Sequence, residues 1–197
     1  MQTELIITLI ASYLIGAIPS GVVLTKLTGA GDVRKSGSGN IGATNVYRTA
    51  GRKLGILTLV GDIIKGVLPV IYATMIAGMS PEQTAMIACA TFLGHLYPVY
   101  LGFKGGKGVA TALGIYLVLS PLSVLYAGIL FVLLVWIWRY VSLGSILAAA
   151  LVPPLVYFIE QSIPLLIASL FISLMVIWRH RENIGRLLAG EENKFKA

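Results

Sequence analysis

Three polar segments carry the side chains that could do chemistry in an otherwise apolar chain. They read 36-SGSGNIGATNVYR-48, 102-GFKGGKG-108 and 179-RHREN-183. Each combines Arg, Lys or His with Gly, Ser, Thr or Asn. Glycine lets backbone N–H groups converge on a ligand, hydroxyl and amide groups add neutral donors, and the cations supply countercharge. The pattern therefore predicts binding sites for phosphate groups.

The spacing of these residues excludes the common nucleotide loops. A Walker A loop needs Gly-Lys followed by Ser or Thr, whereas Lys107 is followed by Gly108. The dinucleotide-binding glycine motif follows a strand, and no strand is expected here. The two histidines, His95 and His180, are too few for a multi-histidine metal site, and the acidic residues form no metal-ligand pattern. We therefore expect neither a metal nor a cofactor.

The elements that must position these segments are transmembrane helices. Of the 197 residues, 57% are hydrophobic and only 12% are charged, and the mean hydropathy is +0.88. A soluble domain needs more polar surface than this. Glu4 precedes the first apolar run and no basic segment comes before it, so we interpret that run as a retained helix rather than a cleaved signal peptide. We expect one all-α integral membrane domain over residues 1–197.

Seven spans fit the apolar runs. Their expected ranges are 4–27, 54–79, 83–101, 109–120, 122–138, 142–159 and 163–178. The division at Ser120-Pro121 is the least defined, because two short helices and one long kinked helix both fit.

The charges predict the orientation of these spans. Seven crossings place every Lys and Arg except Lys65 on one side, and Glu4, Glu82 and Glu160 on the other. The positive-inside rule then puts the N-terminus outside and the C-terminus in the cytoplasm, with the three polar segments on the cytoplasmic face. This topology explains the net charge of +7 without nucleic acid. Within the second span, Asp62 and Lys65 are spaced i,i+3 and are expected to pair; we favour a packing role and keep a functional one open.

Together, SGSGNIGATNVYR, GHLYPVYLGFKGGKGVAT and RHRENIGRLL resemble the three signature segments of a bacterial membrane enzyme family, the acyl-phosphate:glycerol-3-phosphate acyltransferases or PlsY family. The resemblance covers essentially the whole chain, including the order and spacing of the segments. One departure is Trp178, where Tyr is expected before Arg179.

The resemblance implies an activity and a location. The enzyme would transfer a fatty acyl group from acyl phosphate to the first hydroxyl of glycerol 3-phosphate, giving lysophosphatidic acid and phosphate, the first acylation of bacterial phospholipid synthesis. It would lie in the cytoplasmic (inner) membrane with its site facing the cytoplasm. We expect a monomer without cofactors, and contact with the enzyme that makes acyl phosphate is a further expectation.

The expected site residues come from all three segments. The expected catalytic residues are Ser38, Arg48, Lys107, His180 and Asn183. The expected substrate-binding residues are Thr44, Asn45, Lys104, Gly105, Gly106, Gly108 and Ser145. The glycines would form a backbone cradle, and His180 and Asn183 would share one helical face if the helix continues past Arg179. Either His180 or the donor's phosphate could take the hydroxyl proton.

Two other functions are compatible with parts of the pattern. A transporter of an organic phosphate would place its binding groups near the middle of the membrane, whereas the polar residues here gather at one side. A non-catalytic scaffold would not need glycine-lysine loops beside hydroxyl and amide donors. We therefore expect an enzyme.

Overall fold

The chain is all-helical over residues 2–195, which are the residues that the computed structural model describes. The α-helices are α1 Gln2–Gly16, α2 Ser20–Leu27, α3 Ala43–Ala50, α4 Arg52–Ile71, α5 Pro81–Leu96, α6 Val109–Leu119, α7 Pro121–Trp138, α8 Val141–Glu160, α9 Ile163–Arg179 and α10 Arg181–Leu188. Short 3₁₀ or π turns are η1 Val33–Lys35, η2 Tyr72–Ile76 and η3 Val99–Leu101.

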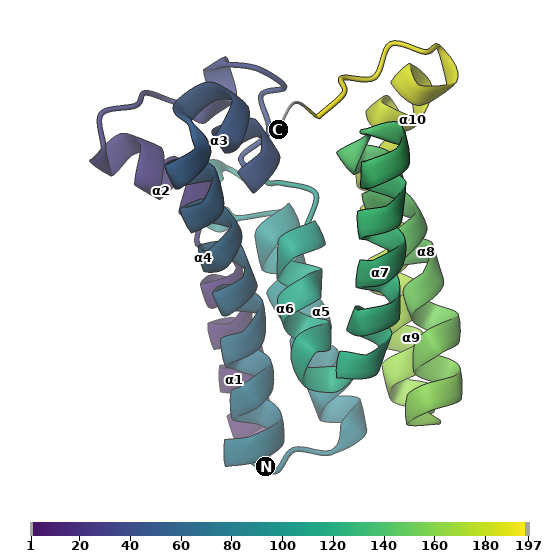
Figure 1. The fold of residues 1–197 in the computed structure, drawn as a ribbon. Helices are drawn as coiled ribbons and strands as arrows, with labels where there is room; N and C mark the ends of the chain where they lie inside the picture. The colour runs from purple at the N-terminus through teal and green to yellow at the C-terminus, as the bar shows by residue number, and fades with distance from the viewer. Residues whose placement is uncertain (1, 196–197) are drawn as a thin grey trace. The chain divides into compact units, whose positions relative to one another are not determined.

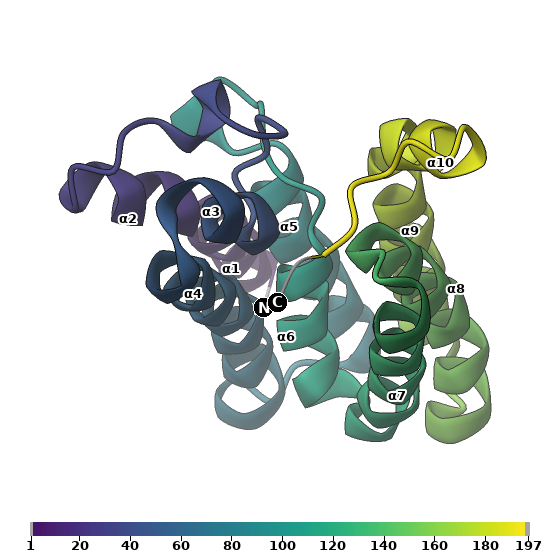
Figure 2. The ribbon, with the colours of Figure 1, turned by 45° about the horizontal axis from the view of Figure 1, so that its top comes forward.

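The helices form two compact units that divide after Val118. In the first unit, α5 packs against α1 and α4, and α3 packs on α4 (Figure 1). In the second unit, α8 packs against both α7 and α9, and α10 contacts the ends of α8 and α9 (Figures 1 and 2).

The long helices are suited to a membrane. Among residues 2–195, four helices are long and apolar enough to cross a bilayer, or up to six if each of two bent pairs counts as one span. Helix α6 is apolar but shorter. Large side chains remain on the outside, such as Trp136 at 77% and Phe158 at 72% exposed, as expected where lipid covers the protein. The structure therefore supports several crossings, and the expected seven remain a proposal.

The first expected span, 4–27, is broken. Helix α1 ends at Gly16 and α2 begins at Ser20, with a bend of 47° between them. Pro19 causes the break, because it lacks an N–H group and disfavours helical backbone at Ile18. The freed Ile18 carbonyl accepts a hydrogen bond from Lys65 Nζ at 2.7 Å.

The expected division at Ser120-Pro121 is present as two separate helices. Helix α6 ends at Leu119 and α7 begins at Pro121, a first helical position that proline favours. Ser120 Oγ donates to Glu160 Oε1 at 2.7 Å and lies 2.7 Å from Ser123 Oγ. These bonds join the start of α7 to the end of α8 within the second unit.

Helices α1 and α5 meet at glycines. A Cβ atom at Gly16 would overlap the carbonyl of Thr91, and one at Gly94 would overlap the carbonyl of Tyr13. The backbones therefore touch directly, as small residues allow in membrane helix pairs. Tyr13 Oη also donates to the Tyr97 carbonyl at 2.6 Å, next to the loop that contains Lys107.

Candidate active site

The first polar segment is organised by Asn45. Its Nδ2 donates to the carbonyl oxygens of Val33, Ser36 and Asn40 at 2.8–3.1 Å. Its Oδ1 accepts the Ser38 N–H at 2.9 Å, and the residue is only 3% exposed. The structure thus differs from the expectation that Asn45 binds substrate directly: the amide is occupied in holding the loop, and we reassign Asn45 to positioning.

Helix α3 presents the other predicted residues of this segment. It begins at Ala43, as expected from the glycine-rich turn before it. Thr44 is half-buried in its first turn, and Arg48 is exposed one turn later on the same face. Ser38 is exposed in the preceding loop. Buried Val46 anchors the helix in a small apolar core with Val22, Val33 and Ile41.

Arg34, which lies just before this segment, has a carboxylate partner. Arg34 Nε donates to Asp32 Oδ1 at 2.9 Å, and Nη2 donates to Oδ2 in a two-pronged pair. These side-chain bonds, with a backbone bond from the Arg34 N–H, hold the pKa of Asp32 well below its usual range. The Arg34 guanidinium is thus engaged with Asp32, and Arg48 stays the arginine predicted from the sequence to bind a substrate phosphate.

The glycines of the second segment have a different role from the expected one. The N–H groups of Gly105 and Gly106 donate to the carbonyls of Leu96 and His95, at 3.1 and 3.2 Å. They therefore close the end of α5 rather than form a cradle, which corrects the expectation for these two donors. A Cβ atom at Gly106 would overlap His95 Nε2, so the loop lies directly on the imidazole ring.

Lys107 and Lys104 differ in how far each is buried. Lys107 is half-buried, just before Gly108, whose positive φ of 83° favours glycine and whose carbonyl accepts the Ala112 N–H in the first turn of α6. Lys104 is exposed. The backbone on both sides of Lys107 is thus fixed, which favours Lys107 as the site cation.

A buried polar cluster lies under this loop. Lys65 Nζ is 2.8 Å from Asp62 Oδ1, and both side chains are 4% exposed, which confirms the expected pair. His95 Nδ1 lies 3.9 Å from the same carboxylate oxygen and 3.1 Å from Thr111 Oγ1. The cluster connects α4, α5 and α6 and is buried. We therefore interpret it as support for the Lys107 loop rather than as a binding surface.

The third segment contains a bend that the sequence did not predict. Helix α9 ends at Arg179, α10 begins at Arg181, and the two are inclined by 55°. His180 lies at the break, so His180 and Asn183 are not on one continuous helix as expected. His180 Nδ1 is 2.8 Å from the Val176 carbonyl oxygen, an acceptor, so the proton of the neutral ring is on Nδ1 and Nε2 is the acceptor nitrogen.

Asn183 is held by a residue that sequence reasoning missed. Its Nδ2 donates to Glu192 Oε1 at 2.7 Å, and Ser142 Oγ donates to the same oxygen at 2.8 Å. Arg186 Nε donates to Glu192 Oε2 at 2.8 Å. Partial burial opposes ionisation, but these hydrogen bonds outweigh it and keep the pKa of Glu192 below its ordinary value.

Ser145 has a partner within its own helix. It is buried one turn after the start of α8, and its Oγ donates to the Val141 carbonyl at 2.8 Å. Its lone pairs can accept a hydrogen bond, but its proton is occupied. Ser145 therefore fits a substrate-binding role less well than Ser38 or Thr44.

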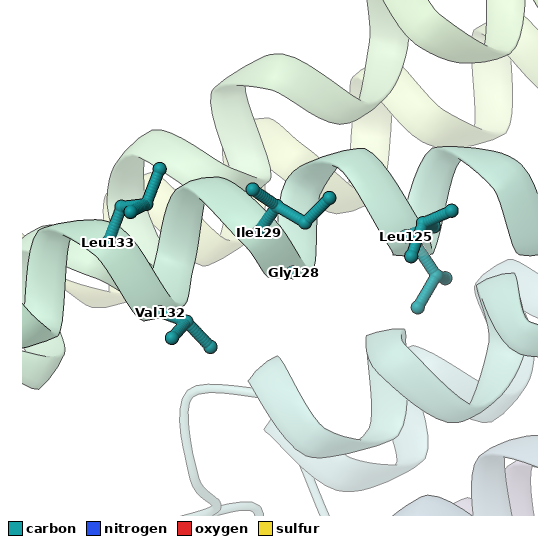
Figure 3. A pocket seen from close by; sticks show the side chains of 6 residues that line it. Leu125, Gly128, Ile129, Val132 and Leu133 are labelled. Carbon is teal, nitrogen blue, oxygen red and sulfur yellow. The ribbon is translucent and has the colours of Figure 1, made fainter.

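An apolar groove runs along α7 in the second unit (Figure 3). It is lined by Val124, Leu125, Gly128, Ile129, Val132 and Leu133. Gly128 leaves space between the larger side chains, because a Cβ atom there would meet nothing within 4 Å. Among residues 2–195, no group of three or more His, Cys, Asp or Glu side chains could hold a metal ion.

A family model described as glycerol-3-phosphate acyltransferase matches residues 6–190. The chain belongs to this family. The glycerol-3-phosphate acyltransferase of Syntrophotalea carbinolica is 64% identical over 196 residues, which is 100% of both chains. That of Geobacter sulfurreducens is 54% identical over 198 residues, again 100% of both.

The chain is also similar to two crystal structures of PlsY, described as an integral membrane glycerol 3-phosphate acyltransferase. The glycerol 3-phosphate form has a TM-score of 0.92 at 40% identity, covering 98% of this chain and 96% of that one. The lysophosphatidic acid form has a TM-score of 0.89 at 39% identity with the same coverage. The acyltransferase activity and the multi-pass membrane character predicted from the sequence are confirmed by these matches.

Proposed function

We propose that the acyltransferase uses acyl phosphate as donor and acylates the 1-hydroxyl of glycerol 3-phosphate. The observation that supports this most directly is the similarity over 98% of the chain to PlsY in its glycerol 3-phosphate and lysophosphatidic acid forms. The products are 1-acylglycerol 3-phosphate and inorganic phosphate. The site faces the cytoplasm of the inner membrane, because the cations of the polar segments lie on the positive-inside face of the seven-span topology.

The donor explains why no nucleophilic triad is needed. Acyl phosphate is a mixed anhydride with a good leaving group. The hydroxyl oxygen forms a bond to the acyl carbon, the bond from that carbon to the phosphate oxygen breaks, and phosphate leaves with the electron pair. The protein must hold two anions together and stabilise the developing negative charge.

The predicted residues divide this work by their chemistry. Arg48 suits two-pronged binding of a phosphate, and Lys107 supplies a second positive charge. Ser38 and Thr44 add neutral donors, and exposed Lys104 adds a further charge at the rim. Glycines 105, 106 and 108 shape the backbone that presents Lys107. Ser145, His180 and Asn183 are the further residues that the sequence predicts to take part.

The hydroxyl proton goes either to His180 or to the donor's phosphate. The hydrogen bond from Nδ1 to the Val176 carbonyl favours His180, because it leaves Nε2 as the acceptor nitrogen. The fatty tail lies along the apolar groove on α7, which offers hydrocarbon contacts and no charged group.

One assay tests the proposal. The protein is purified in detergent and given acyl phosphate with glycerol 3-phosphate; we expect lysophosphatidic acid and phosphate in equal amounts. Acyl-CoA in place of acyl phosphate should give no product. If folded protein releases neither product, acyl phosphate is not its donor. Transport activity that needs sealed vesicles and leaves the substrates unchanged would indicate a transporter of organic phosphate instead.

A further inference from the structure

The Lys107 loop lies on two ring side chains of α5. Phe92 and His95 are one turn apart near the end of that helix, on the same side of it, and their exposed fractions are 0% and 3%. A Cβ atom at Gly106 would overlap the His95 ring, and one at Gly108 would overlap the Phe92 ring. The backbone immediately before and after Lys107 is therefore packed against α5, with no side chain in between.

His95 holds the chain on both sides of Lys107. On one side, the Gly106 N–H donates to the His95 carbonyl at 3.2 Å. On the other side, Thr111 Oγ1 in the first turn of α6 lies 3.1 Å from His95 Nδ1. Both side chains are buried, so water does not compete for this hydrogen bond. One residue of α5 thus fixes both the loop and the start of the helix that follows it.

The surroundings of His95 are themselves fixed by α4. A Cβ atom at Gly66 would overlap the Thr111 carbonyl, so α4 and α6 touch at their backbones. Asp62 Oδ1 lies 3.9 Å from His95 Nδ1, and Lys65 compensates the charge of this carboxylate. These contacts leave the imidazole ring little room to move, as is required of a group that supports a functional side chain.

We propose that His95 is a positioning residue for Lys107: its ring and its hydrogen bond with Thr111 hold the loop so that the Lys107 ammonium meets a substrate phosphate. This rests on the proposed function, in which Lys107 supplies a positive charge to that phosphate. His95 is buried against Gly106 and acts through the loop, whereas Lys107 is only half-buried. Placement matters because an error of about 1 Å in a reacting geometry can lower the rate about 10²-fold.

Two substitutions of Thr111 separate the hydrogen bond from packing. Thr111→Val keeps the shape of the side chain and removes the hydroxyl, whereas Thr111→Ser keeps the hydroxyl and removes the methyl group. We expect Thr111→Val to lower kcat/KM about tenfold and Thr111→Ser to stay within about twofold of the parent. The matched control is Thr91→Val, because Thr91 is equally buried but its hydroxyl donates to the Ile87 carbonyl within α5. The control should behave as the parent.

A second measurement reports on Lys107 without using the reaction. Acetylation of Lys107 by an amine-reactive ester is measured by mass spectrometry relative to acetylation of exposed Lys104, which lies in the same loop. The ratio should rise several-fold in Thr111→Val and stay at the parent value in Thr111→Ser and Thr91→Val. His95→Ala should raise the ratio further and lower kcat/KM about a hundredfold. Thermal unfolding shows whether each variant is folded at the assay temperature, and the Thr111 variants carry the test if His95→Ala is not.

Three results would overturn the proposal. One is Thr111→Val with the kcat/KM of the parent. Another is Thr111→Ser as impaired as Thr111→Val, which would leave only a packing role. The third is a loss of activity in Thr111→Val with an unchanged acetylation ratio, because His95 would then act on something other than Lys107. If the parent forms no product from acyl phosphate, the proposed function fails instead, and the acetylation ratios still decide whether His95 and Thr111 fix Lys107.

Discussion

Asp62 and Lys65 face each other one helical turn apart inside α4, with Lys65 Nζ 2.8 Å from Asp62 Oδ1 and both side chains almost completely buried. Lys65 also donates to the Ile18 carbonyl, which the α1–α2 break leaves without a helical partner. The pair thus joins a helix interior to a helix break. Its members compensate each other's charge, which supports the packing role favoured from the sequence.

Replacing one member of this pair should lower the free energy of unfolding more than replacing both members together. Lys65→Met leaves a buried carboxylate and Asp62→Asn leaves a buried ammonium, and each should destabilise the protein by about 3–5 kcal/mol. The double variant D62N/K65M should be less destabilised than the sum. Thermal unfolding in detergent measures this, and simple additivity of the two changes would show that the residues do not act as a pair.

Asn45→Asp should loosen the loop of the first polar segment, which the Asn45 side chain holds by hydrogen bonds. A carboxylate cannot donate to the carbonyls of Val33, Ser36 and Asn40, so it loses three bonds that the amide makes. We expect activity to fall at least about tenfold, from the loss of two or more hydrogen bonds at about 1 kcal/mol each.

Limited trypsin digestion provides the structural readout for the same variant. Arg34 and Lys35 are exposed in η1, and cleavage there should become faster in Asn45→Asp. Thr49→Val is the matched control, because the exposed Thr49 hydroxyl only donates to the Asn45 carbonyl. If Asn45→Asp loses activity but is cleaved by trypsin at the rate of the parent, Asn45 binds substrate directly, as first expected from the sequence.

His180→Ala should lower kcat by about 10²-fold or more, because a positioned general base contributes about 10²–10⁴-fold. KM for glycerol 3-phosphate should change much less. The pH profile of kcat distinguishes the two proton acceptors: if His180 is the base, we expect a loss of rate at acidic pH in the parent that is missing from the residual activity of His180→Ala. An unchanged profile would assign the proton to the donor's phosphate.

Gly128→Leu should shorten the preferred acyl donor. The added side chain fills the groove between Leu125 and Val132, where nothing lies within 4 Å of an added Cβ atom. Rates with long acyl phosphates should fall several-fold relative to short ones. Gly185→Ala, at an equally open glycine on α10, is the control and should leave the ratio unchanged. An unchanged ratio for Gly128→Leu would place the fatty tail elsewhere.

The C-terminal segment should detach in acid. Because the pKa of Glu192 in the folded protein lies below its ordinary value of 4.5, its stabilisation is present above that pH and is lost as the pH falls through the folded pKa. A nitroxide label at Glu191→Cys, with Cys89→Ser, reports this detachment as increased mobility. The same label should be mobile at every pH in E192Q, and a label equally mobile in the parent at pH 7 would contradict the contact.

Local signals predicted the parts of the structure that depend on neighbouring residues. Pro121 after an apolar run predicted a helix boundary, the glycine-rich turn before Ala43 predicted α3, and the i,i+3 spacing of Asp62 and Lys65 predicted their pair. Each depends on residues within about one helical turn, where proline, glycine and side-chain spacing have direct effects.

The remaining features depend on contacts that spacing does not reveal. The sequence does not show whether the Gly105 N–H binds a phosphate or a backbone carbonyl. Only the fold shows that it donates to the Leu96 carbonyl at the end of α5. The bend at His180 could not be predicted, because no proline or glycine lies at the break between α9 and α10. Glu192 reaches Ser142 across 50 residues, and only the folded chain shows why this one of two adjacent glutamates is buried.

Helix α6 has only 11 residues, so it is about 16 Å long, whereas the hydrocarbon layer of a bilayer is about 30 Å thick. If α6 crosses the membrane, then either lipid must thin around it or its flanking loop must sink below the lipid headgroups. The Lys107 loop precedes α6 directly, and the N–H groups of Gly102, Gly105 and Gly106 in it have protein partners, which allows irregular backbone at such depth. A water-soluble phosphate ester and a membrane-bound fatty acyl donor could then meet without the fatty chain leaving the bilayer.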